Sequence, residues 1–149
     1  MNNLDSQDII EARKNQEDPI VMYLIVRESL GMGMGKTAAQ CAHASQMLQL
    51  KFNEESNEAK NGDISKWFKF NNIPDIKLFE EWLNTSFRKV VLSADEKEWK
   101  NIKALEYKYV LVIDNGLTEI SPGSETVIGF FPMKKSNVPK IIKRLQTLK

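Results

Sequence analysis

Four polar side chains in this sequence are spaced so that they could act together: Lys36, Gln40, His43 and Asp114. The first three fall within roughly 60° of arc on an expected helix, because each helical residue turns the chain by about 100°. Asp114 directly follows the apolar run of residues 109–113. An ammonium group beside a carboxylate, with an amide and an imidazole nearby, suits proton transfer and the stabilisation of negative charge.

Two apolar runs must bring these groups together. Residues 20–26 and 109–113 are β-branched and apolar on both faces, which is typical of central strands covered by helices on both sides. A glycine-rich turn (residues 31–37) follows the first run, and an Asp-Asn-Gly turn follows the second. Ligands bind beyond the carboxyl ends of parallel strands. If these strands are parallel, Lys36 and Asp114 lie beside each other at one edge of the sheet.

The helix expected over residues 38–50 has one side of small residues, which lets it lie close to a sheet. These residues are Ala38, Cys41, Ala42 and Ser45. We expect this side to pack, with Cys41 as a small buried hydrophobe, and Lys36, Gln40 and His43 to face outward near the glycine-rich turn.

The remaining patterns complete an α/β fold of order β-α-α-β-α-β-β-α, a single compact domain with a four-stranded mixed sheet and helices on both faces. Strands are expected at residues 20–26, 88–92, 109–113 and 126–131. Further helices are expected over residues 75–84, after a capping box at residues 93–96, and at the end of the chain, with the stripe Val138, Ile141, Ile142, Leu145 and Leu148. Residues 53–63 are expected to form an exposed loop.

Composition limits the class of protein. The chain has 149 residues, of which 42% are hydrophobic and 28% charged, as in an ordinary globular domain. One cysteine and one histidine exclude a disulfide framework and a Cys/His zinc site. No apolar run reaches the roughly 18 residues of a membrane span. The start has neither a secretory nor a mitochondrial pattern, so we expect a cytoplasmic protein.

Charge is distributed unevenly along the chain. Residues 1–18 hold five acidic and two basic residues and are expected to form a flexible acidic tail before a domain at 19–149. Residues 133–149 hold six basic residues and no acidic one. A basic C-terminal face suits an anionic partner such as nucleic acid, and it equally suits a solvated, lysine-rich helix.

Two long motifs resemble those of type II peptidyl-tRNA hydrolases, the archaeal and eukaryotic kind. Residues 27–44, RESLGMGMGKTAAQCAHA, resemble the family pattern R-x-D-L-K-M-G-K-G-K-x-A-A-Q-x-x-H-A. Residues 114–129, DNGLTEISPGSETVIG, resemble D-A-G-R-T-Q-I-A-P-G-S-x-T-V-L-G. Both motifs occur in order and at family spacing, and the resemblance covers roughly residues 20–149.

The resemblance implies a homodimer that hydrolyses the ester joining a peptide to the terminal ribose of tRNA, so that peptidyl-tRNA is the substrate. It implies no metal or organic cofactor and no membrane partner. The site residues that it implies are Lys36, Gln40, His43, Asp114, Thr118 and Thr126. We expect Asp114 to orient or deprotonate water and Lys36 to stabilise the oxyanion or a tRNA phosphate. Gln40 and His43 would position water and ribose, and both threonines would add hydrogen bonds.

Five positions depart from the family pattern in charge: Ser29, Gly31, Met34, Leu117 and Glu119. Three of them remove a positive charge and Glu119 adds a negative one, so we expect weaker contacts to tRNA phosphates. The alternative function is a catalytically weak or inactive member of the same fold that binds tRNA or a protein.

A nucleotide-binding P-loop is a further alternative, since a strand, Gly35-Lys36-Thr37 and a helix follow in the right order. The P-loop motif needs its first glycine at position 30, where this chain has Leu30. We therefore predict that Mg-ATP leaves the thermal unfolding temperature unchanged, because only a ligand that binds the folded state raises it. A rise that grows with Mg-ATP concentration would favour the P-loop interpretation.

Overall fold

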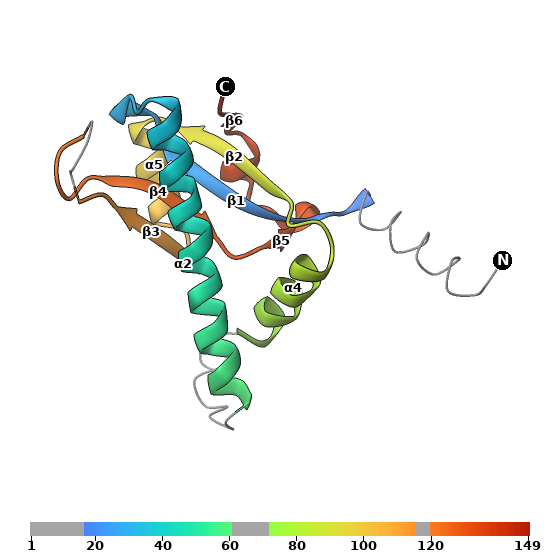
Figure 1. Ribbon diagram of the computed structural model, residues 1–149. Helices are drawn as coiled ribbons and strands as arrows, with labels where there is room; N and C mark the ends of the chain where they lie inside the picture. Colours follow the sequence, from blue (N-terminus) through green and yellow to red (C-terminus); the bar gives the residue numbers. More distant parts are fainter. Residues whose placement is uncertain (1–16, 61–71, 116–119) are drawn as a thin grey trace.

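The computed structural model describes residues 17–60, 72–115 and 120–149, which form one mixed sheet with helices on both faces (Figure 1). The strands are β1 (Ile20–Arg27), β2 (Lys89–Ala94), β3 (Tyr109–Ile113), β4 (Glu125–Phe130), β5 (Met133–Lys134) and β6 (Gln146–Thr147). The helices are α2 (Met34–Lys60), α4 (Asn72–Asn84), α5 (Glu96–Lys103) and α6 (Lys140–Lys143), with 3-10 turns η1 (Glu28–Leu30) and η2 (Lys135–Asn137).

Strand β1 lies near the middle of the strand order β3-β4-β1-β2-β6. It pairs with β2 in parallel and with β4 antiparallel, and β4 in turn pairs antiparallel with β3. Strands β1 and β3 therefore run in the same direction, with β4 between them. The two strands thus have the same direction, as the prediction from the sequence required. The turns that follow β1 and β3 therefore lie at the same edge of the sheet.

The side chains of β1 alternate between two cores, which explains its continuous apolar run. Met22 and Leu24 pack with α2 and α4 on one face, and Tyr23 and Ile25 pack with α5 and α6 on the other. The expected helices on both faces are thus confirmed. The expected four strands are not the full set, because the described residues also form β5 on β1 and β6 on β2.

Helix α2 is longer than the sequence predicts, and the expected loop at residues 53–63 is wrong for residues 53–60, which are helical. The extension is held by tertiary contacts: Phe52 stacks on Phe79 of α4 with ring centroids 4.3 Å apart, and Glu55 pairs with Lys108. This half of α2 projects beyond the sheet beside α4 (Figure 1), so its other residues can be polar. None of the described helices is long and apolar enough to cross a membrane.

The ends of α5 and of the chain also differ from expectation. The capping box is formed by Asp95 and Glu98, not by Ser93 and Glu96, because Ser93 remains in β2 and pairs with Gln146. The last helix contains only Lys140–Lys143. The chain then extends as β6 along the edge of β2, where it satisfies backbone groups that would otherwise face water.

The expected tail lies mostly outside the described residues, since these begin at residue 17. Within the described part, the Asp18 carboxylate accepts hydrogen bonds from the backbone N–H and the hydroxyl of Ser136, at 2.9 and 2.7 Å. These bonds lower the Asp18 pKa. The start of the described chain is therefore hydrogen-bonded to η2.

At Gly129, α2 packs closely against the sheet. A Cβ at this position would lie 3.0 Å from Leu48 Cδ1 and 3.2 Å from Ala44 Cβ. We predict that Gly129→Ala lowers the free energy of unfolding, measured in urea, by about 1–3 kcal/mol, because a packed core does not admit another methyl group without shifting.

Gly35→Ala is the control for this substitution, since nothing lies within 4 Å of its Cβ position. We expect it to leave the free energy of unfolding unchanged or to raise it by up to about 1 kcal/mol. An equal loss of unfolding free energy in Gly129→Ala and Gly35→Ala would contradict a steric origin of the destabilisation at Gly129.

Candidate active site

A buried ion pair joins the start of α2 to the end of β3. The Nζ atom of Lys36 lies 2.5 Å from Oδ1 of Asp114, and their side chains are only 11% and 7% exposed. The backbone of Asp114 is held on both sides: its N–H donates to the Ser124 carbonyl at 2.9 Å, and its carbonyl accepts from the Gly123 N–H at 2.8 Å. The carboxylate is therefore fixed in place before any ligand arrives.

Gln40 and Thr126 extend this pair into a buried chain of hydrogen bonds. Thr126 Oγ1 donates to Gln40 Oε1 at 2.6 Å, and Gln40 Nε2 donates toward Asp114 Oδ1 at 3.4 Å. Gln40 is 3% exposed and Thr126 is fully buried. Because the threonine hydroxyl occupies the amide oxygen, the amide nitrogen must face the carboxylate.

An irregularity in β4 gives Thr126 its direction. The pairing of β3 with β4 shifts register between Val112 and Ile113, so that Val112 pairs with Val127 but Ile113 pairs with Glu125. Thr126 is the extra residue, and such a bulge redirects side chains. Thr126 and Val127 both face α2, whereas Glu125 faces α5.

The rotation of α2 about its axis corrects one expectation. The expected packing side included Ala38 and Ala42, but both are exposed, and Gln40, expected to face outward, is buried. The helix packs through its large residues farther along, Leu48 and Phe52, and these determine its rotation. The side that meets the sheet therefore carries Gln40 toward Thr126.

Cys41 is buried as expected, and burial raises the pKa of its thiol to about 11. A thiol in that state is a poor nucleophile. His43 lies one turn beyond Gln40 with an exposed side chain, so the structure does not bring it into the buried chain of hydrogen bonds. Thr118 lies outside the described residues.

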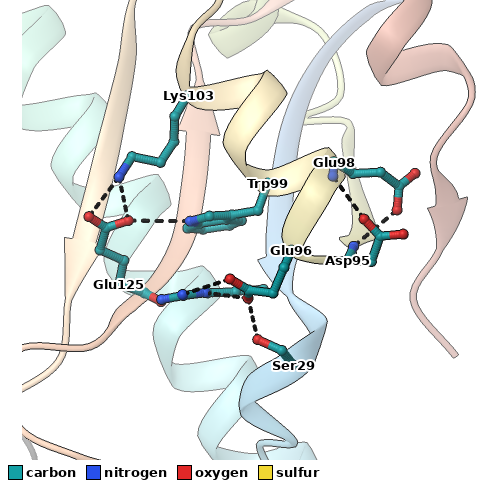
Figure 2. Close-up of polar contacts among 8 residues, drawn as sticks. Ser29, Asp95, Glu96, Glu98, Trp99, Lys103 and Glu125 are labelled. Atoms are coloured by element: carbon teal, nitrogen blue, oxygen red, sulfur yellow. Dashed lines mark hydrogen bonds and ion pairs between the residues drawn. The ribbon is translucent and has the colours of Figure 1, made fainter.

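A second polar cluster, which the sequence did not indicate, lies on the α5 face of the same strand ends (Figure 2). Arg27, at the end of β1, donates to both carboxylate oxygens of Glu96 at 2.8 and 2.9 Å, and Ser29 also donates to Glu96. The Arg27 and Ser29 bonds lower the pKa of Glu96 to about 2. Ser29 thus has a partner on α5, although the family pattern has an acidic residue at its position.

Glu125 is the other acidic residue of this cluster. It accepts from Lys103 Nζ at 2.7 and 2.8 Å and from Trp99 Nε1 at 3.2 Å, and the lysine bond is the main cause of its lowered pKa. The signal that could have indicated this cluster is positional. Arg27 ends one strand and Glu125 begins its neighbour, beside a helix with alternating acidic and basic residues.

The described residues contain no group of three or more histidine, cysteine or acidic side chains that could hold a metal ion. The arrangement at Lys36 and Asp114 offers instead a fixed carboxylate that can accept a proton and an ammonium group that can stabilise an oxyanion.

Comparison with known proteins gives a consistent result. A family model described as peptidyl-tRNA hydrolase PTH2 matches residues 20–148. A peptidyl-tRNA hydrolase of Methanococcus maripaludis is 33% identical over 130 residues, which cover 84% of this chain and 96% of that protein. One from Pyrobaculum aerophilum is 31% identical over 135 residues, 87% and 98% of the two chains. The mitochondrial peptidyl-tRNA hydrolase 2 of Bos taurus is 31% identical, over 84% of this chain and 62% of its own length.

We predict that Thr126→Val lowers the free energy of unfolding by about 1–3 kcal/mol, because it leaves the buried Gln40 oxygen without its donor while preserving side-chain shape. Thr37→Val is the matched control: Thr37 is only 9% exposed, but the bond from its hydroxyl to the Met32 carbonyl is long, at 3.4 Å. Chemical denaturation of both variants measures the difference. A loss at Thr37 as large as that at Thr126 would contradict a special contribution from the Thr126–Gln40 bond.

Proposed function

Because the chain belongs to the PTH2 family of peptidyl-tRNA hydrolases, we propose that it hydrolyses the ester bond between peptide and tRNA and releases free tRNA and an N-blocked peptide. This activity would return tRNA from stalled translation to use. The observation that supports the proposal most directly is the buried Lys36–Asp114 pair, backed by Gln40 and Thr126, at the positions of the two family motifs.

The reaction needs a water molecule made nucleophilic, a stabilised tetrahedral intermediate and a protonated leaving group. In our proposal Asp114 orients the water and accepts its proton as the oxygen attacks the ester carbonyl. The Lys36 ammonium stabilises the negative charge that develops on the carbonyl oxygen. Collapse of the intermediate breaks the bond to the ribose oxygen, which takes up the proton that Asp114 had accepted from water and leaves as the free tRNA hydroxyl, so that the Asp114 carboxylate is regenerated.

Gln40 and Thr126 act as positioning residues in this scheme. Gln40 donates a hydrogen bond to the Asp114 carboxylate, and Thr126 holds Gln40 in place. Polar groups that are held in this way need little reorganisation during the reaction. His43, exposed one turn along α2, is proposed to contact ribose or water from the solvent side. Thr118 stays a predicted hydrogen-bonding residue.

The reaction as proposed uses no metal or organic cofactor. We further propose that the protein acts in the cytoplasm, where peptidyl-tRNA would arise during translation. The homodimer implied by the family resemblance also stays a prediction. The alternative function is that of a catalytically weak or inactive member of the same fold that binds tRNA, and the activity assay must distinguish the two.

We predict that Lys36→Ala and Asp114→Asn each lower kcat by at least about 100-fold, the usual loss when an oxyanion donor or a general base is removed. The measurement is release of tRNA from N-acetyl-aminoacyl-tRNA, with unblocked aminoacyl-tRNA as the comparison substrate. Lys51→Ala is the matched control, since Lys51 is an exposed lysine of the same helix, and it should keep wild-type turnover.

Thermal unfolding of each variant separates lost chemistry from lost folding. Full turnover by Lys36→Ala would overturn the assignment of the site. A wild-type protein that binds tRNA but cleaves neither substrate would instead support the inactive alternative.

A further inference from the structure

A groove of about 730 Å³ lies between α5 and the start of β4. One wall carries Lys97, Lys100 and Lys103 of α5, and the other is formed by Gly123 and Ser124. The three lysines are spaced three residues apart, so they follow one face of the helix. The cluster of Figure 2 forms part of the lining of this groove.

Two cations of this groove are engaged within the protein and two are not. Arg27 is paired with Glu96, and Lys103 is paired with Glu125. Lys97 and Lys100 are exposed and make no ion pair with any described residue. The four cations and two carboxylates leave a net charge of +2, which is located at these two ammonium groups.

The groove shares its wall with the candidate active site. Gly123 and Ser124, which line it, are the residues that hydrogen-bond to the backbone of Asp114, at 2.8 and 2.9 Å. The groove, on the α5 face of the sheet, is therefore one hydrogen bond from the backbone of Asp114, whose carboxylate contacts Lys36 of α2. A tRNA whose ester bond reaches Asp114 can therefore extend along this groove.

We propose that Lys97 and Lys100 bind the phosphate backbone of the tRNA part of the substrate, next to the cleaved ester. This inference rests on the proposed function. Ammonium groups on flexible stems suit phosphates, which need charge more than fixed geometry. The contacts also offset the positive charges absent at Gly31 and Met34, where the family pattern has lysines.

The structure also places other basic residues on the same face of the sheet, on α6, where Lys140 and Lys143 are exposed. Helix α6 packs against α5, but its residues do not line the groove beside Gly123 and Ser124. Equal in number and in charge to Lys97 and Lys100, these two lysines provide a matched control.

The test compares Lys97→Ala/Lys100→Ala with Lys140→Ala/Lys143→Ala. For N-acetyl-aminoacyl-tRNA at low salt, we expect the α5 double variant to raise KM about 10-fold or more with kcat unchanged, because phosphate contacts act equally in ground and transition states. The slope of log kcat/KM against log salt should become shallower by roughly 1.4–1.8, about 0.7–0.9 for each lost contact. The α6 variant should keep the wild-type slope.

A short substrate separates this inference from the proposed function. N-acetyl-aminoacyl-adenosine carries the ester without the phosphate backbone, and the α5 variant should cleave it at the wild-type rate. Binding of uncharged tRNA, followed by fluorescence anisotropy over the same salt range, decides the inference even if the wild type cleaves nothing. An unchanged salt slope in the α5 variant, or a larger change in the α6 variant, would overturn it.

Discussion

Strand β1 is the constraint on which the rest of the molecule depends. It is buried on both faces from Ile20 to Val26 and pairs with strands of both directions. Because β4 lies between them, β3 is parallel to β1, and both strands end at the same edge of the sheet. With β3 reversed, Asp114 would lie about 16 Å away, at the opposite end of a five-residue strand, and Lys36 would have no carboxylate beside it.

The buried pair at this edge is better explained by chemistry than by stability. Removing an ammonium group and a carboxylate from water costs several kcal/mol for each ion, and their attraction often only offsets that cost. Gln40 and Thr126 add hydrogen bonds that reduce the deficit, but apolar residues of similar size would pack there without incurring it. The family motifs place ionised groups at this position, as expected of a site whose charges act on a substrate.

Much of the sheet could be predicted because burial on both faces leaves a strong sequence signal. Strand β3 has the bounds that its apolar run predicts. The two-residue strands β5 and β6 have no such signal, because two residues show no periodicity. The length of α2 was missed for a different reason: its second half is polar and is held by Phe52 and Glu55 through contacts with distant segments.

The proximity of Lys36 and Asp114 could be predicted from the sequence, but the orientation of Gln40 could not. The order of turns and strands brings Lys36 and Asp114 together, and the structure has them in contact. The burial of Gln40 depends on a partner 86 residues away, Thr126, and thus on tertiary packing that single-helix periodicity does not report. The charged cluster around Glu96 and Glu125 depends in the same way on the placement of α5 against the strand ends.

The bulge in β4 bears on how the molecule tolerates insertions and deletions. It allows the adjacent residues Glu125 and Thr126 to serve opposite faces of the sheet, one in the charged groove and one beneath α2. Lengthening a surface turn is usually absorbed by the turn itself. Loss of Thr126 would restore strict alternation, so that Glu125 would still face α5 but no threonine hydroxyl would lie beneath α2 to meet Gln40. The groove at Glu125 and the buried hydrogen bonds at Thr126 therefore both depend on the number of residues in β4. Substitutions in these two places should be tolerated more readily than an insertion or a deletion between them.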